Sequence, residues 1–332
     1  MYPFILERPT DLAAALAFRA QAGRNDAPAE YVAGGTDMVQ LLQEHVRRPE
    51  RLVSLRGLLD RKIQVGPEGL HLGAAATMAE VAADPDVVRQ YPLIAEALLA
   101  SASPQVRNQA TMGGNVLQRT RCPYFRDVAY AACNKRTPGS GCSAIGGQNR
   151  WHAVLGTSEH CIAAHASDLA VALLALDAAV EVRGAGGTRT VRLSELYRLP
   201  SDAPHMETVL EPGEAITGIT VPATTTGWRS HYLKVRDRAS FEFALVAAGV
   251  ALDMDGNRIR QARVALGGVG TKPWRLPNVE SALAGATLDP TVLRQAASRA
   301  AEGAQGHGHN DFKIELMQRA IVRAVEIAGA RA

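Results

Sequence analysis

The four cysteines of this chain all lie in one segment, which directly follows a glycine-rich run. The chain has 332 residues and only 4 cysteines, at Cys122, Cys133, Cys142 and Cys161. Random placement would scatter them, so their confinement favours one shared metal centre over separate core residues. Four thiolates suit an iron–sulfur cube or a structural zinc ion. The fold is therefore expected to wrap this segment around one point, beside the run Thr111-Met112-Gly113-Gly114-Asn115.

The cysteine intervals do not identify the metal by themselves. They are C-x10-C, C-x8-C and C-x18-C, which match neither a paired zinc ribbon nor a compact ferredoxin run. The segment between Asn115 and Asp168 is predicted to be a long ordered loop. His160 and His165 flank Cys161, but four cysteines already complete the usual ligand set. Two disulfides would require an oxidising compartment.

Length and charge narrow the function classes. A chain of 332 residues predicts more than one packed unit. The 36 basic and 33 acidic residues leave a net charge of +3, and no basic run is interleaved with aromatics, so nucleic-acid binding is not indicated. The longest apolar stretch, Leu169 to Leu176, is too short to cross a bilayer. No export signal of its own is recognised. We expect a cytoplasmic protein, or a periplasmic one exported as a folded complex through a signal carried by a partner.

The first glycine turn follows a short strand. Thr10-Asp11 is predicted to cap an alanine-rich helix that runs to about Ala22 and ends at Gly23. The strand Tyr31 to Ala33 then leads into Gly34-Gly35-Thr36-Asp37 and a helical segment from Met38 to His45. A strand, a glycine turn and a helix N-terminus suit a diphosphate, although such a turn alone is more often a plain loop.

The second glycine turn strengthens the nucleotide hypothesis. It lies at Thr111 to Asn115, after a predicted helix from Pro92 to Ala102. Two such turns can hold an extended dinucleotide from two sides. The chain has neither the G-x-G-x-x-G fingerprint in its strand–helix context nor a phosphate-binding P-loop motif, so nicotinamide and P-loop sites are not indicated.

The C-terminal part is predicted to combine a hairpin with helices. Phe243 to Asp253 and Ile259 to Leu266 flank the turn Asp255-Gly256-Asn257. Thr291 to Glu302 and Phe312 to Ala330 carry apolar residues at helical spacing, and the second helix is expected to cover a small antiparallel sheet. The predicted fold class is α+β.

These motifs together resemble the FAD-binding (medium) subunits of the molybdenum hydroxylases, the family of xanthine dehydrogenase and carbon monoxide dehydrogenase. The resemblance covers essentially the full chain and depends on the order of its elements: Ala33 to Asp37, Thr111 to Asn115, Ser167-Asp168-Leu169-Ala170, the stretch after Ile216-Thr217-Gly218-Ile219, and Tyr232-Leu233-Lys234-Val235-Arg236. It implies a PCMH-type FAD-binding domain of two lobes, followed by an antiparallel sheet-plus-helices domain like the C-terminal domain of carbon monoxide dehydrogenase flavoproteins. The expected units are 1–55, 56–225 with an insertion at 117–165, and 226–332.

The cysteine insertion distinguishes this chain within the family, since most medium subunits lack it. The strings Cys122-Pro123-Tyr124-Phe125-Arg126-Asp127 and Gly139-Ser140-Gly141-Cys142 resemble the FAD subunits of periplasmic aldehyde oxidoreductases, and more loosely 4-hydroxybenzoyl-CoA reductase. The resemblance implies a 4Fe–4S cluster on the four cysteines. It also implies a large subunit with the molybdenum cofactor and a small subunit with two 2Fe–2S clusters.

The resemblance further implies roles for individual residues. Backbone amides of Ala33, Gly34, Gly35, Thr36 and Asp37 would bind the FAD diphosphate, and Thr111, Gly114 and Asn115 would do so from the second turn. Asp168 would hydrogen-bond to the flavin nucleotide, or cap the helix that follows it. Lys234 would lie near the isoalloxazine or its ribityl chain, the alternative being an exposed edge-strand lysine.

The expected function is electron transfer within an aldehyde-oxidising oxidoreductase, with no catalytic acid or base on this chain. Electrons would arrive from the 2Fe–2S subunit and leave from FAD to an external acceptor. A 4-hydroxybenzoyl-CoA reductase-like subunit is the nearest alternative. A stand-alone flavin oxidase and a zinc-stabilised structural module are alternatives from other classes.

Overall fold

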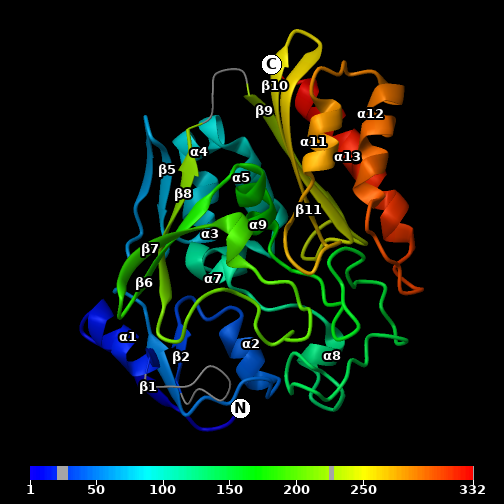
Figure 1. Cartoon of the computed structure of the whole chain (residues 1–332). Helices are drawn as coiled ribbons and strands as arrows, with labels where there is room; N and C mark the ends of the chain where they lie inside the picture. Colours follow the sequence, from blue (N-terminus) through cyan, green and yellow to red (C-terminus); the bar gives the residue numbers. More distant parts are fainter. Residues whose placement is uncertain (21–28, 224–227, 332) are drawn as a thin grey trace.

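The computed structural model describes residues 1–20, 29–223 and 228–331, and its strands form three sheets (Figure 1). The sheet orders are β1-β3-β2, β4-β5-β8-β6-β7 and β12-β11-β10-β9. Figure 1 shows helices between the five-stranded sheet and the four-stranded sheet, with the N-terminal sheet below them. The predicted α+β class is confirmed. No helix within the described ranges has the length and apolar character needed to cross a membrane.

The N-terminal lobe is a small parallel sheet with two helices. Its elements are β1 (Ile5–Glu7), α1 (Leu12–Ala20), β2 (Ala29–Val32), α2 (Met38–Gln43) and β3 (Arg51–Ser54), and both β1 and β2 pair with β3 in parallel. Asp11 Oδ1 accepts a hydrogen bond from Ala14 N at 2.8 Å, which confirms a capping role. The predicted end of this helix at Ala22 and Gly23 lies outside the described residues. Helix α2 ends before His45, whose φ of 60° is incompatible with a continued right-handed helix.

The middle sheet is antiparallel throughout. It contains β4 (Ile63–Gly66), β5 (Gly69–Gly73), β6 (Ala179–Gly184), β7 (Gly187–Arg192) and β8 (Ala215–Pro222). The accompanying helices are α3 (Met78–Ala83), α4 (Pro85–Gln90), α5 (Pro92–Ala100), α6 (Pro104–Arg107), α7 (Met112–Val116), α9 (Asp168–Ala175) and α10 (Leu193–Leu196). Helix α5 stops before Ala102, which has a φ of 51°.

Helix α9 forms the centre of the molecule. Every residue of this helix is buried, as its uniformly apolar sequence after Asp168 predicts. It contacts α5, α7 and the strands β10 and β11, and its side chains share one core with both larger sheets. The site residues at its N-terminus are therefore held by the most deeply packed element of the fold.

The cysteine segment is mostly loop, as predicted. Its one helix in the described residues is the single turn α8 (Pro123–Arg126). Cys133 and Cys142 face each other in an isolated antiparallel bridge. The segment packs against the N-terminal lobe, because Leu41 of α2, Phe125 and Cys133 share a small buried cluster.

The C-terminal domain contains the predicted hairpin. Its strands are β9 (Trp228–Val235), β10 (Val246–Asp255), β11 (Arg258–Gly267) and β12 (Trp274–Arg275), followed by α11 (Pro277–Leu283), α12 (Pro290–Ser298), a 3-10 turn (Arg299–Ala301) and α13 (Phe312–Gly329). Strand β10 begins later than predicted, because Phe243 belongs to the preceding loop. Helix α13 packs on β10 and β9 and buries its apolar face, which confirms that it covers the sheet.

Candidate functional site

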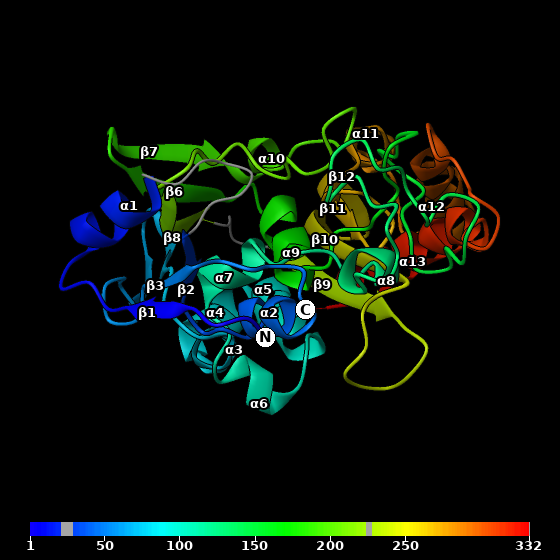
Figure 2. The same cartoon turned by 90° about the horizontal axis from the view of Figure 1, so that it is seen from below.

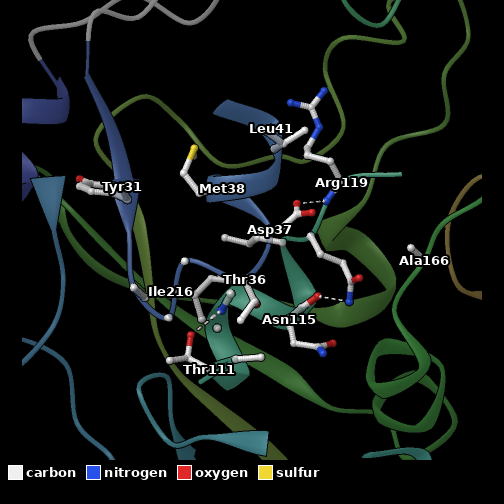
Figure 3. Close-up of a pocket in the computed structure, with 18 of the residues that line it drawn as sticks. Tyr31, Thr36, Asp37, Met38, Leu41, Thr111, Asn115, Arg119, Ala166 and Ile216 are labelled. Carbon is white, nitrogen blue, oxygen red and sulfur yellow. Dashed lines mark hydrogen bonds between the residues drawn. The ribbon is translucent and has the colours of Figure 1, made fainter. Parts of the chain in front are cut away.

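A cavity of about 650 Å³ lies between the N-terminal lobe and the central helices. Every cofactor-binding residue predicted from the sequence contributes to its wall: Ala33, Gly34, Gly35, Thr36, Asp37, Thr111, Gly114, Asn115, Asp168 and Lys234. Figure 3 shows Thr36, Asp37, Thr111 and Asn115 around this space, with Asp37 near Arg119. The fold thus brings both glycine turns, the start of α9 and strand β9 to one place.

The two glycine turns approach each other through their backbones. A Cβ added at Gly34 would stand 1.9 Å from the carbonyl oxygen of Gln109, which precedes the second turn. Gly35 has a φ of 76°, which an L side chain rarely adopts. Glycine is therefore required at both positions to close the first turn against the second.

The second glycine turn is the start of a short helix. Thr111 caps α7, and its hydroxyl accepts a hydrogen bond from Gly114 N at 3.3 Å. The Asn115 side chain is buried and accepts from Ser167 Oγ at 2.6 Å, which ties α7 to the cap of α9. The cap of α9 is Ser167, whose hydroxyl accepts from Ala170 N at 3.0 Å. The alternative prediction that Asp168 caps this helix is wrong.

Asp168 instead forms a buried ion pair with Lys234. The distance from Lys234 Nζ to Asp168 Oδ2 is 2.8 Å, and the two side chains are only 3% and 7% exposed. Asp168 also accepts hydrogen bonds from Ser101 Oγ at 2.8 Å and Tyr232 Oη at 2.7 Å. Burial and the Asp168 carboxylate raise the pKa of Tyr232, so this phenol remains a donor. The alternative that Lys234 is an exposed edge-strand lysine is wrong, although β9 is the edge strand of its sheet.

The Asp37 carboxylate faces the cysteine segment. Its Oδ2 accepts from Arg119 N at 2.9 Å, and its Oδ1 lies 2.9 Å from Arg121 Nη1 and 2.6 Å from Arg126 Nη2. Arg126 also pairs with Glu44 and donates to Thr120 O. Burial lowers the pKa of Arg121 to about 10, which leaves it charged at neutral pH. The first glycine turn is therefore fastened to the cysteine segment by a set of ionic hydrogen bonds.

A second charged group joins the cavity to the cysteines. Glu207 pairs with Arg119 and with Lys135, whose Nζ is 2.8 Å from Glu207 Oε1. Burial alone would raise the pKa of Glu207, but the charges of Arg119 and Lys135 outweigh it and hold the pKa at about 2. Burial raises the pKa of Cys161, and the charge of Lys135 opposes this increase in part. Glu207 and Arg119 both contribute to the cavity wall.

The four cysteines are free of disulfides, with Cys133 and Cys161 buried and Cys122 and Cys142 partly buried. Burial raises the pKa of the Cys122 thiol to about 12, and the neighbouring thiols of Cys161 and Cys133 contribute smaller parts of this increase. Cys142 acts on Cys161 in the same way. In the described part of the chain, no three His, Cys, Asp or Glu side chains are grouped closely enough for a single metal ion.

Two buried histidines border the cysteines. His152 Nε2 lies 3.1 Å from Cys122 Sγ, and burial lowers the pKa of His152 to about 4. His165 packs edge-on against Tyr197, with the ring centroids 4.6 Å apart, and burial lowers its pKa to about 4. Both rings are therefore neutral at physiological pH.

Sequence reasoning missed several residues of the cavity wall. Arg119 and Arg121 could have been predicted as site residues, because they lie between the second glycine turn and Cys122 in the sequence. Ser101 and Glu207 could not, since their role depends on tertiary contacts. Phe241 and Phe243 also line the cavity from the loop between β9 and β10, which projects from the molecule near α8 in Figure 2.

Comparisons with known proteins agree with this layout. A family model described as the FAD binding domain in molybdopterin dehydrogenase matches residues 2–224, and one described as the CO dehydrogenase flavoprotein C-terminal domain matches residues 231–328. The chain is similar to the aldehyde oxidoreductase FAD-binding subunit PaoB of Escherichia coli K12, with 44% identity over 92% of each chain.

More distant relatives share the whole fold. The medium chain of carbon monoxide dehydrogenase from Afipia carboxidovorans is 26% identical over 99% of this chain and 98% of its own length. A solved structure of reconstituted CO dehydrogenase from Oligotropha carboxidovorans superimposes with a TM-score of 0.77 over 100% of both chains, at 26% identity. The chain belongs to the family of FAD-binding medium subunits of the molybdenum hydroxylases, which are oxidoreductase subunits of the xanthine dehydrogenase type.

Proposed function

We propose that this chain is the FAD- and 4Fe–4S-containing electron-transfer subunit of a heterotrimeric molybdenum aldehyde oxidoreductase. It takes electrons from a 2Fe–2S subunit and passes them from FAD to an external acceptor. The observation that carries the proposal is the single cavity in which both glycine turns, Asp168 and Lys234 converge, fastened by ionic contacts to a four-cysteine segment. Aldehyde oxidation and the partner subunits are inferred from the similarity to the Escherichia coli subunit.

The chain's own residues account for FAD binding in this proposal. Backbone amides at 33–37 and 111–115 hold the diphosphate, since glycine permits close approach of the backbone. Bound FAD supplies two-electron chemistry. Lys234 provides a fixed positive charge in the cavity wall, which the Asp168 carboxylate beside it holds in place and partly offsets. A cation there favours the added negative charge of reduced flavin and so raises its potential.

The four cysteines supply the thiolate set that a 4Fe–4S cluster or a zinc ion requires, and we propose the cluster. None of the four thiols forms a disulfide. Cys161 and Cys133 affect the pKa of Cys122, and Cys142 affects that of Cys161, so the four side chains are close enough to interact electrostatically. The ligand sulfurs around a single zinc ion must lie close together, because each Zn–S bond is only about 2.3 Å. The ligand sulfurs of a cube lie farther apart, at the corners of a larger tetrahedron. The iron and zinc content of the purified chain therefore distinguishes the two cofactors.

Reduction of the complex with and without FAD tests the proposal. The chain is co-expressed with its large and small partner subunits, as wild type and as Gly34→Arg, whose side chain cannot fit against Gln109. We expect an aldehyde to reduce the 2Fe–2S centres in both complexes, while electron delivery to a soluble acceptor occurs only in the wild type. Full acceptor turnover by an FAD-free complex would overturn the proposal. Gly66→Arg is the control, since Gly66 has open space around it.

A further inference from the structure

We infer that His152 is a positioning residue of the cysteine site: its Nε2–H donates a hydrogen bond to the Cys122 sulfur and raises the reduction potential of the cluster bound there. The inference rests on the proposed function, because the bond has this effect only if Cys122 is a cluster ligand. The distance from Nε2 to Sγ is 3.1 Å, and His152 is only 1% exposed.

The surroundings of the ring select the tautomer that donates to sulfur. His152 Nδ1 is buried and has no hydrogen-bond partner within the described residues. A cysteine that binds a metal has lost its thiol proton, so a proton on Nδ1 would leave two lone pairs facing each other between Nε2 and the sulfur. A proton on Nε2 removes this repulsion and makes the contact a hydrogen bond. The ring therefore faces Cys122 as a donor.

The C-terminal domain holds the backbone of His152 in place. The carbonyl oxygen of His152 accepts from Lys313 Nζ at 3.0 Å and from Asn310 Nδ2 at 3.3 Å. Lys313 also donates to Gly268 O at 2.8 Å, and Lys313 and Asn310 are both 0% exposed. A fully buried lysine that fixes this carbonyl is a costly arrangement, and it restrains the ring relative to Cys122. The start of α13 thus sets the geometry of a contact in a different domain.

The expected effect on the cluster follows from charge. Reduction adds an electron to the iron–sulfur core, and part of the added charge resides on the ligand sulfurs. An N–H···S hydrogen bond stabilises that charge, so it favours the reduced state. Loss of the bond should shift the potential to lower values without changing the set of four ligands.

The test compares two substitutions with opposite expectations. His152→Phe keeps a planar ring but has no donor, whereas His152→Gln retains an N–H group of similar reach. His160→Gln is the matched control, because His160 lies in the same segment with a half-exposed ring that pairs only with Glu159 among the described residues. Each complex is assayed for iron, sulfide and FAD, and the cluster potential is measured by redox titration with low-temperature electron spin resonance.

The inference predicts a lower potential for His152→Phe with full iron, and near wild-type potentials for His152→Gln and His160→Gln. Cluster loss in His152→Phe with retention in His152→Gln also supports a positioning hydrogen bond. An unchanged potential in His152→Phe overturns the inference and leaves the proposed function intact. Cluster loss in both variants, with FAD retained, would make His152 a ligand and overturn it as well. Wild-type protein without iron would overturn the cluster and the inference together.

A measurement on the wild type remains decisive if the variants fail to fold. Protein labelled with ¹⁵N-histidine is reduced and studied by pulsed electron spin resonance. A weak ¹⁵N coupling, together with an exchangeable proton coupled to the cluster, is the expected signature of N–H···S contact. A strong coupling would indicate direct coordination, and no coupling would indicate no contact; either result contradicts the inference.

Discussion

At the scale of single residues, the buried pair of Asp168 and Lys234 carries most of the site's chemistry. A lysine on an edge strand is ordinarily solvated, but this one is buried against α5 and α9. Burial of an ion pair seldom adds net stability, so its presence beside the cavity favours a functional reason for its retention. Both residues could be named from the sequence, whereas the ion pair between them is visible only in the structure.

Replacing Lys234 by Met is expected to lower the midpoint potential of bound FAD, because the cation near the flavin is removed. The single variant also leaves the buried Asp168 carboxylate without its ion-pair partner, which is expected to cost about 3–5 kcal/mol of folding stability. The double variant Lys234→Met with Asp168→Asn is the control for that loss. It should recover stability, and a flavin potential that stays below the wild-type value would assign the effect to the lost cation rather than to the unpaired Asp168 carboxylate. An unshifted flavin potential in folded, FAD-loaded Lys234→Met protein would contradict the proposal that Lys234 raises the potential of the flavin.

Glu207 should make stability depend on acid pH. Its pKa of about 2 in the folded protein lies below the unfolded value of 4.5, so its charge pairs stabilise the fold fully above about pH 5. That contribution is lost as the pH falls from about 5 to about 2. Glu207→Gln removes it at every pH. Chemical denaturation from pH 7 to pH 3 should show the gap between wild type and variant narrowing, and a constant gap would contradict the assignment.

At the scale of elements, the helix starts beside the cavity depend on short polar caps. Thr111 and Ser167 cap α7 and α9, and Asn115 links the two caps. The sequence predicts a glycine turn at Thr111 to Asn115 but does not identify Thr111 as a cap. It also does not decide between Ser167 and Asp168 as the cap of α9, because both residue types are good caps and only the tertiary partners of Asp168 distinguish them.

Thr111→Ala is expected to cost about 1 kcal/mol of stability and to weaken FAD binding, since the lost cap loosens the second glycine turn. Thr111→Ser should preserve both properties. Asp289→Ala removes a comparable cap from α12, far from the cavity wall, and should lower stability without changing FAD affinity. Denaturant unfolding and FAD titration of the apoprotein measure the two effects. Equal FAD affinity in Thr111→Ala and wild type would contradict the role of the turn.

At the scale of the whole molecule, the cysteine segment is part of the FAD-binding architecture rather than an appendage. Asp37 of the first glycine turn contacts three arginines of the cysteine segment. Glu207 forms ion pairs with two basic residues of the same segment. The fold class, the hairpin and the final helices could be predicted from periodicity, and the cavity residues from the resemblance to the family. The ionic contacts could not, because they join positions far apart in the sequence.

Arg126→Ala should weaken FAD binding although Arg126 does not line the cavity. Its guanidinium joins Asp37 and Glu44 to the cysteine segment, so its loss frees the first glycine turn. We expect at least a tenfold loss of FAD affinity, equivalent to about 1.4 kcal/mol. Arg150→Ala is the control, since Arg150 lies in the same segment but its ion pair, with Asp237 in the loop after β9, is exposed. Matching FAD affinities for the two variants would contradict the coupling.

The most direct test of the central claim is the cofactor content of the intact complex. The chain is purified anaerobically with its partner subunits, separated from them, and assayed for FAD, iron, sulfide and zinc, with a visible spectrum recorded alongside. One FAD with about four irons and four sulfides per chain is the predicted result. Zinc without flavin would contradict the account and indicate a structural module. FAD without metal would support the FAD-binding role and contradict the proposed 4Fe–4S cluster.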